Sequence, residues 1–159
     1  MKKLLSITLI LFFGLILLDS CKKTTDVITP AIPAVVGTWK LDRVIITELP
    51  TTYATLNGKN LDPLQYFGYQ SVYNFVVDNT FTDKETQNGI IQDLKGNWAF
   101  TTNQLSLTYS DNTTDGLVYD DVTKLLSSVP TSTSLSLTNP TTQIAESVPC
   151  KIQVVYVKQ

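Results

Sequence analysis

The sequence contains no histidine, and only two of its 159 residues are cysteine. Histidine is the commonest general base and metal ligand of proteins, so its absence removes every Ser-His and Cys-His catalytic arrangement. No other pairing of base and nucleophile is visible, and we expect a protein that is not an enzyme and holds no metal ion or cofactor. A formal charge of −2, with no basic cluster beyond Lys22-Lys23, argues against nucleic acid as a partner.

Long apolar runs are also scarce, and the sequence has a single one, Leu4–Leu18. Lys2-Lys3 precedes this run and Leu18-Asp19-Ser20-Cys21 ends it, which is the pattern of a bacterial lipoprotein signal peptide. A signal core has about 7 to 15 apolar residues, whereas a membrane-spanning helix needs about 20. We therefore expect residues 1–20 to be a cleaved signal peptide and Cys21 to carry the lipid. An uncleaved anchor and an ordinary secretory signal are the alternatives.

A lipid on Cys21 would place the protein in the cell envelope, with the membrane as a partner. The outer membrane is expected, and its periplasmic side is favoured because Lys22-Lys23, not acidic residues, follow the lipidated position. Residues 21–36 hold two prolines and no apolar period, which predicts a flexible tether before a domain over residues 37–159. With Cys21 lipidated, Cys150 has no disulfide partner and is predicted to be a buried core residue.

Short β-rich segments, separated by Asn, Asp, Gly, Pro and Thr, follow one another through the predicted domain. Apolar and polar residues alternate in most of them, as in strands with one buried and one solvated face. The predicted strands are Gly37–Thr47, Ser71–Val77, Thr80–Lys84, Gly89–Leu94 leading into Gly96–Thr101, Gln104–Ser110, Leu117–Leu126, Ser132–Thr138 and Cys150–Val157. In the first of these strands Trp39, Leu41, Arg43 and Ile45 share one parity, and a bulge near Arg43 is the alternative that would turn Val44 and Ile46 inward instead. Asp120–Ser128 is the one stretch that could instead form a short helix.

Residues 48–70 interrupt this rhythm with a long connection. Loops of more than about 12 to 15 residues are uncommon unless they are functional or disordered. The connection contains four aromatic residues, Tyr53, Tyr66, Phe67 and Tyr69. Because disordered segments are poor in aromatics, we expect this connection to fold over the sheet or the barrel mouth as a lid. A helical turn is expected within Leu61–Tyr66.

Gly37-Thr38-Trp39 opens the first predicted strand directly after the tether. A buried Trp at this place can plug the closed end of a small barrel, and Gly lets the entering chain pass close beside it. Three later segments complete the pattern. They are Val72-Tyr73-Asn74-Phe75, Asp78-Asn79-Thr80-Phe81 and a second Gly-x-Trp at Gly96-Asn97-Trp98. The sequence thereby resembles the lipocalin-like lipoproteins of Gram-negative bacteria.

The resemblance implies a barrel in which Gly37 and Trp39 are structural positions. True lipocalins place an arginine from the last strand on this Trp, and here the candidates are Lys151 and Lys158, which cannot stack a planar guanidinium on the ring. The expected fold is all-β, an eight-stranded antiparallel lipocalin-like β-barrel, with an open β-sandwich as the alternative.

The expected function is that of a lipid-anchored, non-enzymatic binding protein for a small hydrophobic or amphipathic ligand. The rings that could line the site are Tyr66, Tyr69, Tyr73, Phe75, Trp98, Phe100 and Tyr109. They could instead fill the core, because an eight-stranded barrel has room only for side chains or one small ligand. The competing hypothesis is a structural or interaction lipoprotein without an internal ligand, either an accessory subunit of an outer-membrane complex or a glycan-binding module. It predicts an exposed patch built from the aromatics of residues 48–70.

Two acidic motifs are interpreted as local structure. Asp111–Gly116 begins like a calcium loop but lacks the bidentate glutamate, so a hairpin turn is expected there. Asp120 and Asp121 would point to opposite faces of a strand and would share no site.

Overall fold

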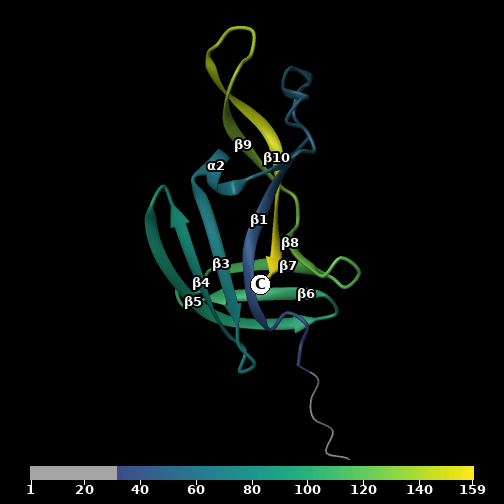
Figure 1. Ribbon diagram of the computed structural model, residues 1–159, viewed down its shortest axis with the longest axis vertical. Helices are drawn as coiled ribbons and strands as arrows, with labels where there is room; N and C mark the ends of the chain where they lie inside the picture. The colour runs from purple at the N-terminus through teal and green to yellow at the C-terminus, as the bar shows by residue number, and fades with distance from the viewer. Residues whose placement is uncertain (1–31) are drawn as a thin grey trace, which may run out of the picture. The chain divides into compact units, whose positions relative to one another are not determined.

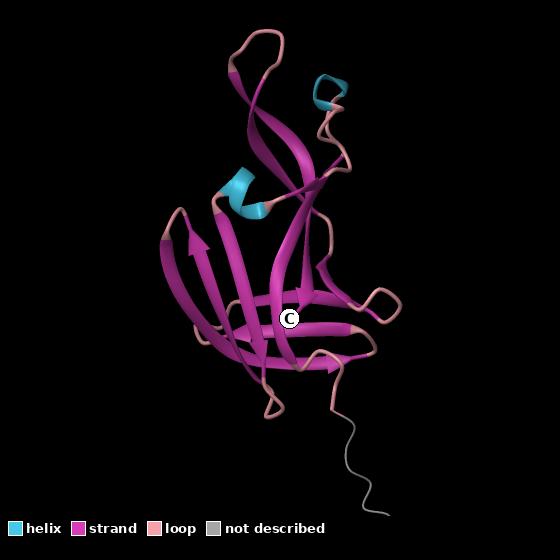
Figure 2. Cartoon of the chain, viewed as in Figure 1, coloured by secondary structure: helices cyan, strands magenta, loops and turns pink. Residues whose placement is uncertain are grey.

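The computed structural model describes residues 32–159, and the expected signal peptide and lipidated Cys21 lie outside this range. Eight strands of the described chain pair antiparallel with their neighbours, and the first of them also pairs with the last (Figure 1). The wall therefore closes, which confirms the expected eight-stranded barrel and excludes the open sandwich. Strands dominate this part of the chain, and helix is limited to two short turns (Figure 2). Within residues 32–159 no helix has the length and apolar character that a membrane crossing requires.

The strands of the wall share an up-and-down arrangement. They are β1 (Gly37–Thr47), β3 (Tyr69–Phe75), β4 (Thr80–Gln87), β5 (Ile90–Thr101), β6 (Gln104–Tyr109), β7 (Thr114–Asp120), β8 (Leu125–Ser128) and β10 (Ala145–Lys158). Each is a neighbour of the next in this order, and β10 returns to β1. Two strands lie outside the wall: β2 (Asn60–Leu61) pairs with β1, and β9 (Thr131–Thr138) pairs with the first half of β10.

Two of the strand predictions need correction. Residues 117–126, predicted as one strand, belong to β7 and β8, because Asp120 Oδ1 accepts the N–H groups of Val122 and Thr123 and turns the chain. The alternative of a helix at Asp120–Ser128 is wrong for the same reason. Residues 132–138 do form a strand, but β9 and the first half of β10 make a two-stranded ribbon that extends beyond the wall (Figure 1).

The predicted bulge in β1 is confirmed. The pairing of β1 with β10 shifts by one residue between Leu41 and Arg43. After this shift Val44 and Ile46 are buried, whereas strict alternation from Trp39 would have turned them outward. The bulge therefore lets one strand supply inward side chains to both ends of the barrel.

One end of the barrel is closed by packing around Trp39. The side chain is 1 % exposed, its Nε1 donates to the Val35 carbonyl at 2.7 Å, and its ring meets Tyr119 edge-on. Val35 itself is fully buried in the same core. The packed chain therefore begins a few residues ahead of Gly37, within the segment expected to be tether.

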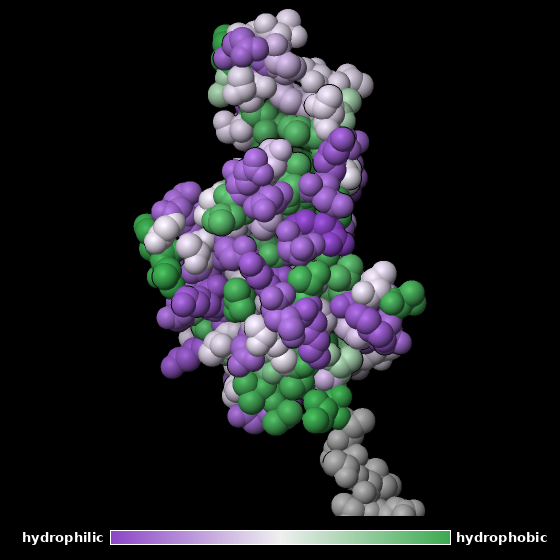
Figure 3. Space-filling model, in the orientation of Figure 1, coloured by the Kyte–Doolittle hydropathy of each residue, from purple (hydrophilic) through white to green (hydrophobic). Residues whose placement is uncertain are grey.

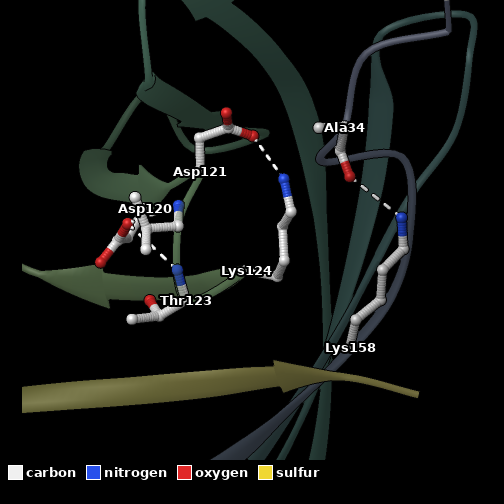
Figure 4. Close-up of polar contacts among 7 residues, drawn as sticks. Ala34, Asp120, Asp121, Thr123, Lys124 and Lys158 are labelled. Carbon is white, nitrogen blue, oxygen red and sulfur yellow. Dashed lines mark hydrogen bonds and ion pairs between the residues drawn. The ribbon is translucent and has the colours of Figure 1, made fainter.

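Lys158 takes the position over Trp39 that the resemblance assigns to arginine. Its Nζ lies 5.6 Å from the centre of the ring and donates to the Ala34 carbonyl at 2.9 Å (Figure 4). The same view shows Lys124 and Asp121 paired at 2.6 Å in the β7–β8 turn. The ammonium group of Lys158 thus connects the end of β10 to the chain that enters β1.

Gly37 allows this close approach. Its φ is +125°, a conformation that side-chain-bearing residues rarely adopt, and a Cβ there would lie 2.9 Å from Lys158 Cε. The structural position expected for Gly37 therefore has a steric reason.

A smaller apolar cluster lies where the β9–β10 ribbon meets the barrel. It consists of Val44, Ile46, Leu61 and Cys150, with side chains of β9 packed against it. Cys150 is 5 % exposed, and burial raises the pKa of its thiol, so it is a packed core residue as predicted.

The outer wall is mostly polar. Hydrophilic residues cover much of the visible face, and apolar residues gather at its lower end (Figure 3). In the β3–β4 turn Val77 is exposed beside the half-exposed Val76. Alternation along the strands thus separates a solvated exterior from a buried interior.

Candidate functional site

Two hollows lie toward the end of the barrel opposite Trp39. The first has a volume of about 420 Å³ and an apolar lining formed by Val44, Phe67, Tyr69, Gln87, Ile152 and Val154. The second has a volume of about 380 Å³, and its lining includes Glu85, Gln92, Leu94, Lys95, Tyr109 and Asp111. We call them the apolar hollow and the polar hollow.

Phe67 reaches the apolar hollow because the short helix α2 (Pro63–Phe67) ends beside it. Asp62 caps the helix by accepting a backbone N–H of the first turn at 2.9 Å, and a proline occupies the first helical position. Gly68 ends the helix at φ +60° and accepts the N–H of Asn88 at 2.7 Å. The helical turn predicted in this connection is confirmed, and the Asn88 contact holds it against the β4–β5 turn.

Polar groups occupy the inward faces of β3 and β4, where a barrel interior is usually apolar. Ser71 and Asp83 are both 0 % exposed, and Ser71 Oγ donates to Asp83 Oδ1 at 2.7 Å. The next inward residues toward the open end are Tyr69 on β3 and Glu85 on β4. The Tyr69 hydroxyl donates to Glu85 Oε1 at 2.5 Å. Because Tyr69 lines the apolar hollow and Glu85 the polar one, this hydrogen bond joins the lining of one hollow to that of the other.

Further tyrosines surround these acids. The hydroxyls of Tyr73 and Tyr109 lie 2.9 Å apart, and the ring centres of Tyr73 and Tyr156 are 5.2 Å apart. We define the inner polar cluster as Tyr69, Ser71, Tyr73, Asp83, Glu85, Tyr109 and Tyr156. It separates the aromatic core of the closed end from the hollows.

The carboxyl of Asp83 is the least satisfied group of the cluster. Its Oδ2 is buried and accepts no hydrogen bond. Burial, together with the negative charges of Glu85 and Asp115, raises the pKa of Asp83 to about 6, against the opposing effect of the hydrogen bond from Ser71. The group is therefore mainly ionised at neutral pH and becomes neutral in mildly acidic solution.

The tyrosines of the cluster remain neutral throughout this range. Burial raises the pKa of Tyr109 to about 12, and it raises the pKa values of Tyr69, Tyr73 and Tyr156 well above their ordinary value. Their hydroxyls can therefore donate hydrogen bonds, and their rings present neutral aromatic faces.

The cluster contains no basic side chain. The ion pairs of residues 32–159 are Arg43–Asp42, Lys124–Asp121 and Lys151–Glu48. None of them includes Asp83 or Glu85. No ion pair within residues 32–159 therefore neutralises these two acids, and the one basic residue in the two hollow linings is Lys95, which borders the polar hollow with Glu85.

The acidic turn motifs have local roles. Asp111 Oδ1 accepts both the N–H and the hydroxyl of Thr113, which builds the β6–β7 turn as expected. Among the residues that the structure describes, no group of three His, Cys, Asp or Glu side chains could hold a metal ion.

The residues predicted to line a site fall into three groups. Tyr69 and Tyr109 line the hollows, and Tyr73 lies in the inner polar cluster between them. Phe75 and Trp98 are buried in the core of the closed end, and neither lines the apolar hollow or the polar hollow.

The remaining two lie at the margins of the predicted site. Phe100 packs against the same core and meets Tyr119 edge-on. Tyr66 is 54 % exposed on α2. The rings thus both fill the core and line hollows, each at a different end of the barrel.

The aromatics of residues 48–70 do not form one exposed patch. Tyr53, in a 3-10 turn (Thr51–Tyr53), is 5 % exposed and its hydroxyl bonds Glu146 of the ribbon at 2.5 Å. Phe67 and Tyr69 face the apolar hollow, which leaves Tyr66 exposed. The first part of this connection therefore braces the ribbon, and its second part borders the mouth.

Sequence reasoning missed the acidic part of the site. Asp83 and Glu85 share the parity of Phe81, so alternation along β4 already placed them on the inward face. It also missed Val44, Ile152 and Val154 as lining residues. These come from β1 and β10, which the sequence separates by about a hundred residues and the closure of the barrel brings together.

Comparison of the chain with protein-family models, with curated proteins and with solved structures finds no match.

Proposed function

We propose that this chain is a lipid-anchored, non-enzymatic binding protein that holds a small hydrophobic or amphipathic ligand at the open end of its barrel. The apolar hollow carries the proposal. Its volume of about 420 Å³ lies within the range of about 300 to 1,000 Å³ that ligand pockets occupy. Strands β1, β3, β4 and β10 and helix α2 build its walls, so five elements hold one apolar lining in place.

The binding would follow from burial of apolar surface. Phe67, Ile152 and Val154 supply apolar contacts, while the Tyr69 hydroxyl and the Gln87 amide can orient a polar group. This division between apolar wall and few polar groups is typical of small-molecule sites. The closed end, filled by its own side chains, would serve as the rigid base.

The test is native mass spectrometry of the full chain, purified with its lipid anchor, in search of a bound small molecule. Ile152→Trp would fill the apolar hollow, and we expect it to abolish the bound species. Val77→Trp, in the exposed β3–β4 turn at the other end, is the matched control and should retain it. A wild-type protein without any bound molecule, or equal occupancy in both variants, would contradict the proposal.

The anchor and its location are part of the same proposal. Cys21→Ser should move the protein from the membrane fraction to the soluble fraction if Cys21 carries the lipid. Protease treatment of intact cells should leave the domain uncut if it lies on the periplasmic side of the outer membrane. Degradation without lysis would instead place it on the cell surface.

A further inference from the structure

The inner polar cluster gathers acidic groups without a cation. Asp83 is fully buried with one free carboxyl oxygen, and Glu85 lies two residues nearer the mouth on the same face of β4. Asp115 of β7 pairs with the inward Leu107 and so shares its facing, although Asp115 itself is exposed. Burying unpaired carboxylates is costly, and proteins usually neutralise them with a partner charge.

Aromatic rings border the acids on several sides. The groups that face Asp83 are Ser71 and Tyr73 of β3, Glu85 of its own strand, Tyr109 of β6, Asp115 of β7 and Tyr156 of β10. All of these are neutral or negative. Carboxylates together with tyrosine faces are the chemistry that recognises ammonium groups, through charge and through the ring quadrupole.

The two hollows provide room for two parts of one molecule. The polar hollow is bordered by Tyr109, by the acids Glu85 and Asp111, and by one lysine, Lys95, so acids outnumber bases in its lining. The apolar hollow is bordered by Phe67 and Val154. The Tyr69–Glu85 hydrogen bond connects their linings. A ligand with a charged head and an apolar body could therefore place one part in each.

We propose that the ligand is an organic cation, with its ammonium group in the polar hollow beside Glu85 and its apolar body in the apolar hollow. This inference rests on the proposed function and names its ligand class. Asp83, beneath Glu85, adds negative potential without contacting solvent. A carboxylate ligand would be repelled by both acids, and a neutral one would leave the negative charge unpaired.

The experiment compares three probes of equal chain length, hexyltrimethylammonium, hexanol and hexanoate. Each is titrated calorimetrically into the full chain held in phospholipid nanodiscs, with empty nanodiscs as the blank. We expect the ammonium probe to bind about tenfold or more tightly than the alcohol, as a desolvated charge interaction allows, and hexanoate to bind weakest. Calcium added in excess should not displace the ammonium probe.

Two isosteric variants test the acids. Glu85→Gln and Asp83→Asn should each reduce the affinity for the ammonium probe and leave hexanol binding unchanged. Asp42→Asn, an equal change of net charge on the outer face of β1, should alter neither. Ammonium binding to the wild type should weaken from pH 7.5 to pH 5 as Asp83 is protonated, and Asp83→Asn should remove most of that dependence.

The outcomes separate the two proposals. If hexanol binds as tightly as the ammonium probe and Ile152→Trp blocks both, the binding function stands and the charge preference is wrong. Tighter binding of hexanoate, unchanged affinity in Glu85→Gln, or displacement by calcium would also overturn the cation proposal. If none of the three probes binds, both proposals fail.

Discussion

The two ends of this barrel are built from the same strands but differ in the side chains that those strands direct inward. From the closed end toward the open end, the inward side chains of β3 change from Phe75 and Tyr73 to Ser71. Those of β4 change from Phe81 to Asp83 and Glu85. At the closed end, rings fill the space between the strands, with centres 5 to 6 Å apart. At the open end, buried polar groups and hollows take their place. Stability and binding capacity are therefore assigned to opposite ends of the same strands.

The contrast shows how a small barrel can tolerate an unfavourable interior at one end. A fully buried carboxylate with an unpartnered oxygen lowers the stability of the fold. Dense packing of large rings a few residues away can offset it, because each ring buries a large apolar area. The comparison predicts opposite effects on stability for substitutions at the two ends.

The largest effect is expected at Trp39. Trp39→Ala removes the largest fully buried side chain and should lower the free energy of unfolding by about 3 to 5 kcal/mol. Trp39→Phe keeps most of the burial but loses the hydrogen bond to Val35, and should cost less. Urea denaturation followed by circular dichroism measures both. A loss below about 1 kcal/mol for Trp39→Ala would show that this end does not dominate stability.

Two glycines test whether the interior beside Phe81 is more tightly packed than the outer face of β7, since Gly96 faces inward and Gly116 faces outward. A Cβ on Gly96 would lie 2.1 Å from the Thr108 carbonyl oxygen and 2.8 Å from Phe81, so β5 or β6 would have to move. Gly96→Ala should therefore cost about 1 to 3 kcal/mol. In Gly116→Ala the nearest atom, the Leu105 carbonyl oxygen, lies 3.9 Å away, and we expect little change. Equal melting temperatures of the two variants would contradict the contrast.

At Asp83, by contrast, a substitution should raise the free energy of unfolding. Its folded pKa of about 6 exceeds the ordinary value of 3.8, so the folded state binds more protons between these values and stability falls as pH rises through this window. Asp83→Asn should raise the free energy of unfolding by about 1 to 2 kcal/mol at pH 8 and give little gain at pH 4. Denaturation at both pH values measures this. Destabilisation at pH 8 would mean that the carboxylate is well compensated in the free protein.

The fold could be predicted because its signals are local. Alternation in residues 104–110, the turn at Asp78-Asn79 and the bulge at Arg43 each depend on a few neighbouring residues. The ribbon of β9 and β10 could not be predicted, because β9 alternates like a wall strand and nothing local shows that it pairs only with the half of β10 that lies beyond the wall.

The site was harder to predict because a lining residue must lie near the open end of its strand as well as on the inward face. In β3, Phe75 and Tyr69 lie on the same inward face, although the predicted strand began only at Ser71. Only the closure of the barrel and the plug at Trp39 show that Phe75 lies in a filled core and Tyr69 at a hollow. Asp83 was overlooked because an isolated acid in a polar strand usually faces solvent, and its burial follows from the strands around it.

The smallest predicted effect concerns the cation over the closed end. Lys158→Arg offers a planar guanidinium to the Trp39 ring and can still reach the Ala34 carbonyl, so we expect a gain of about 0.5 to 1 kcal/mol. Lys158→Met keeps the apolar stem but removes both interactions and should lower stability by a similar amount. Thermal unfolding of the three proteins at two salt concentrations separates charge from packing. If arginine and methionine are equivalent, the stem alone covers Trp39, and the plug of the closed end is purely apolar.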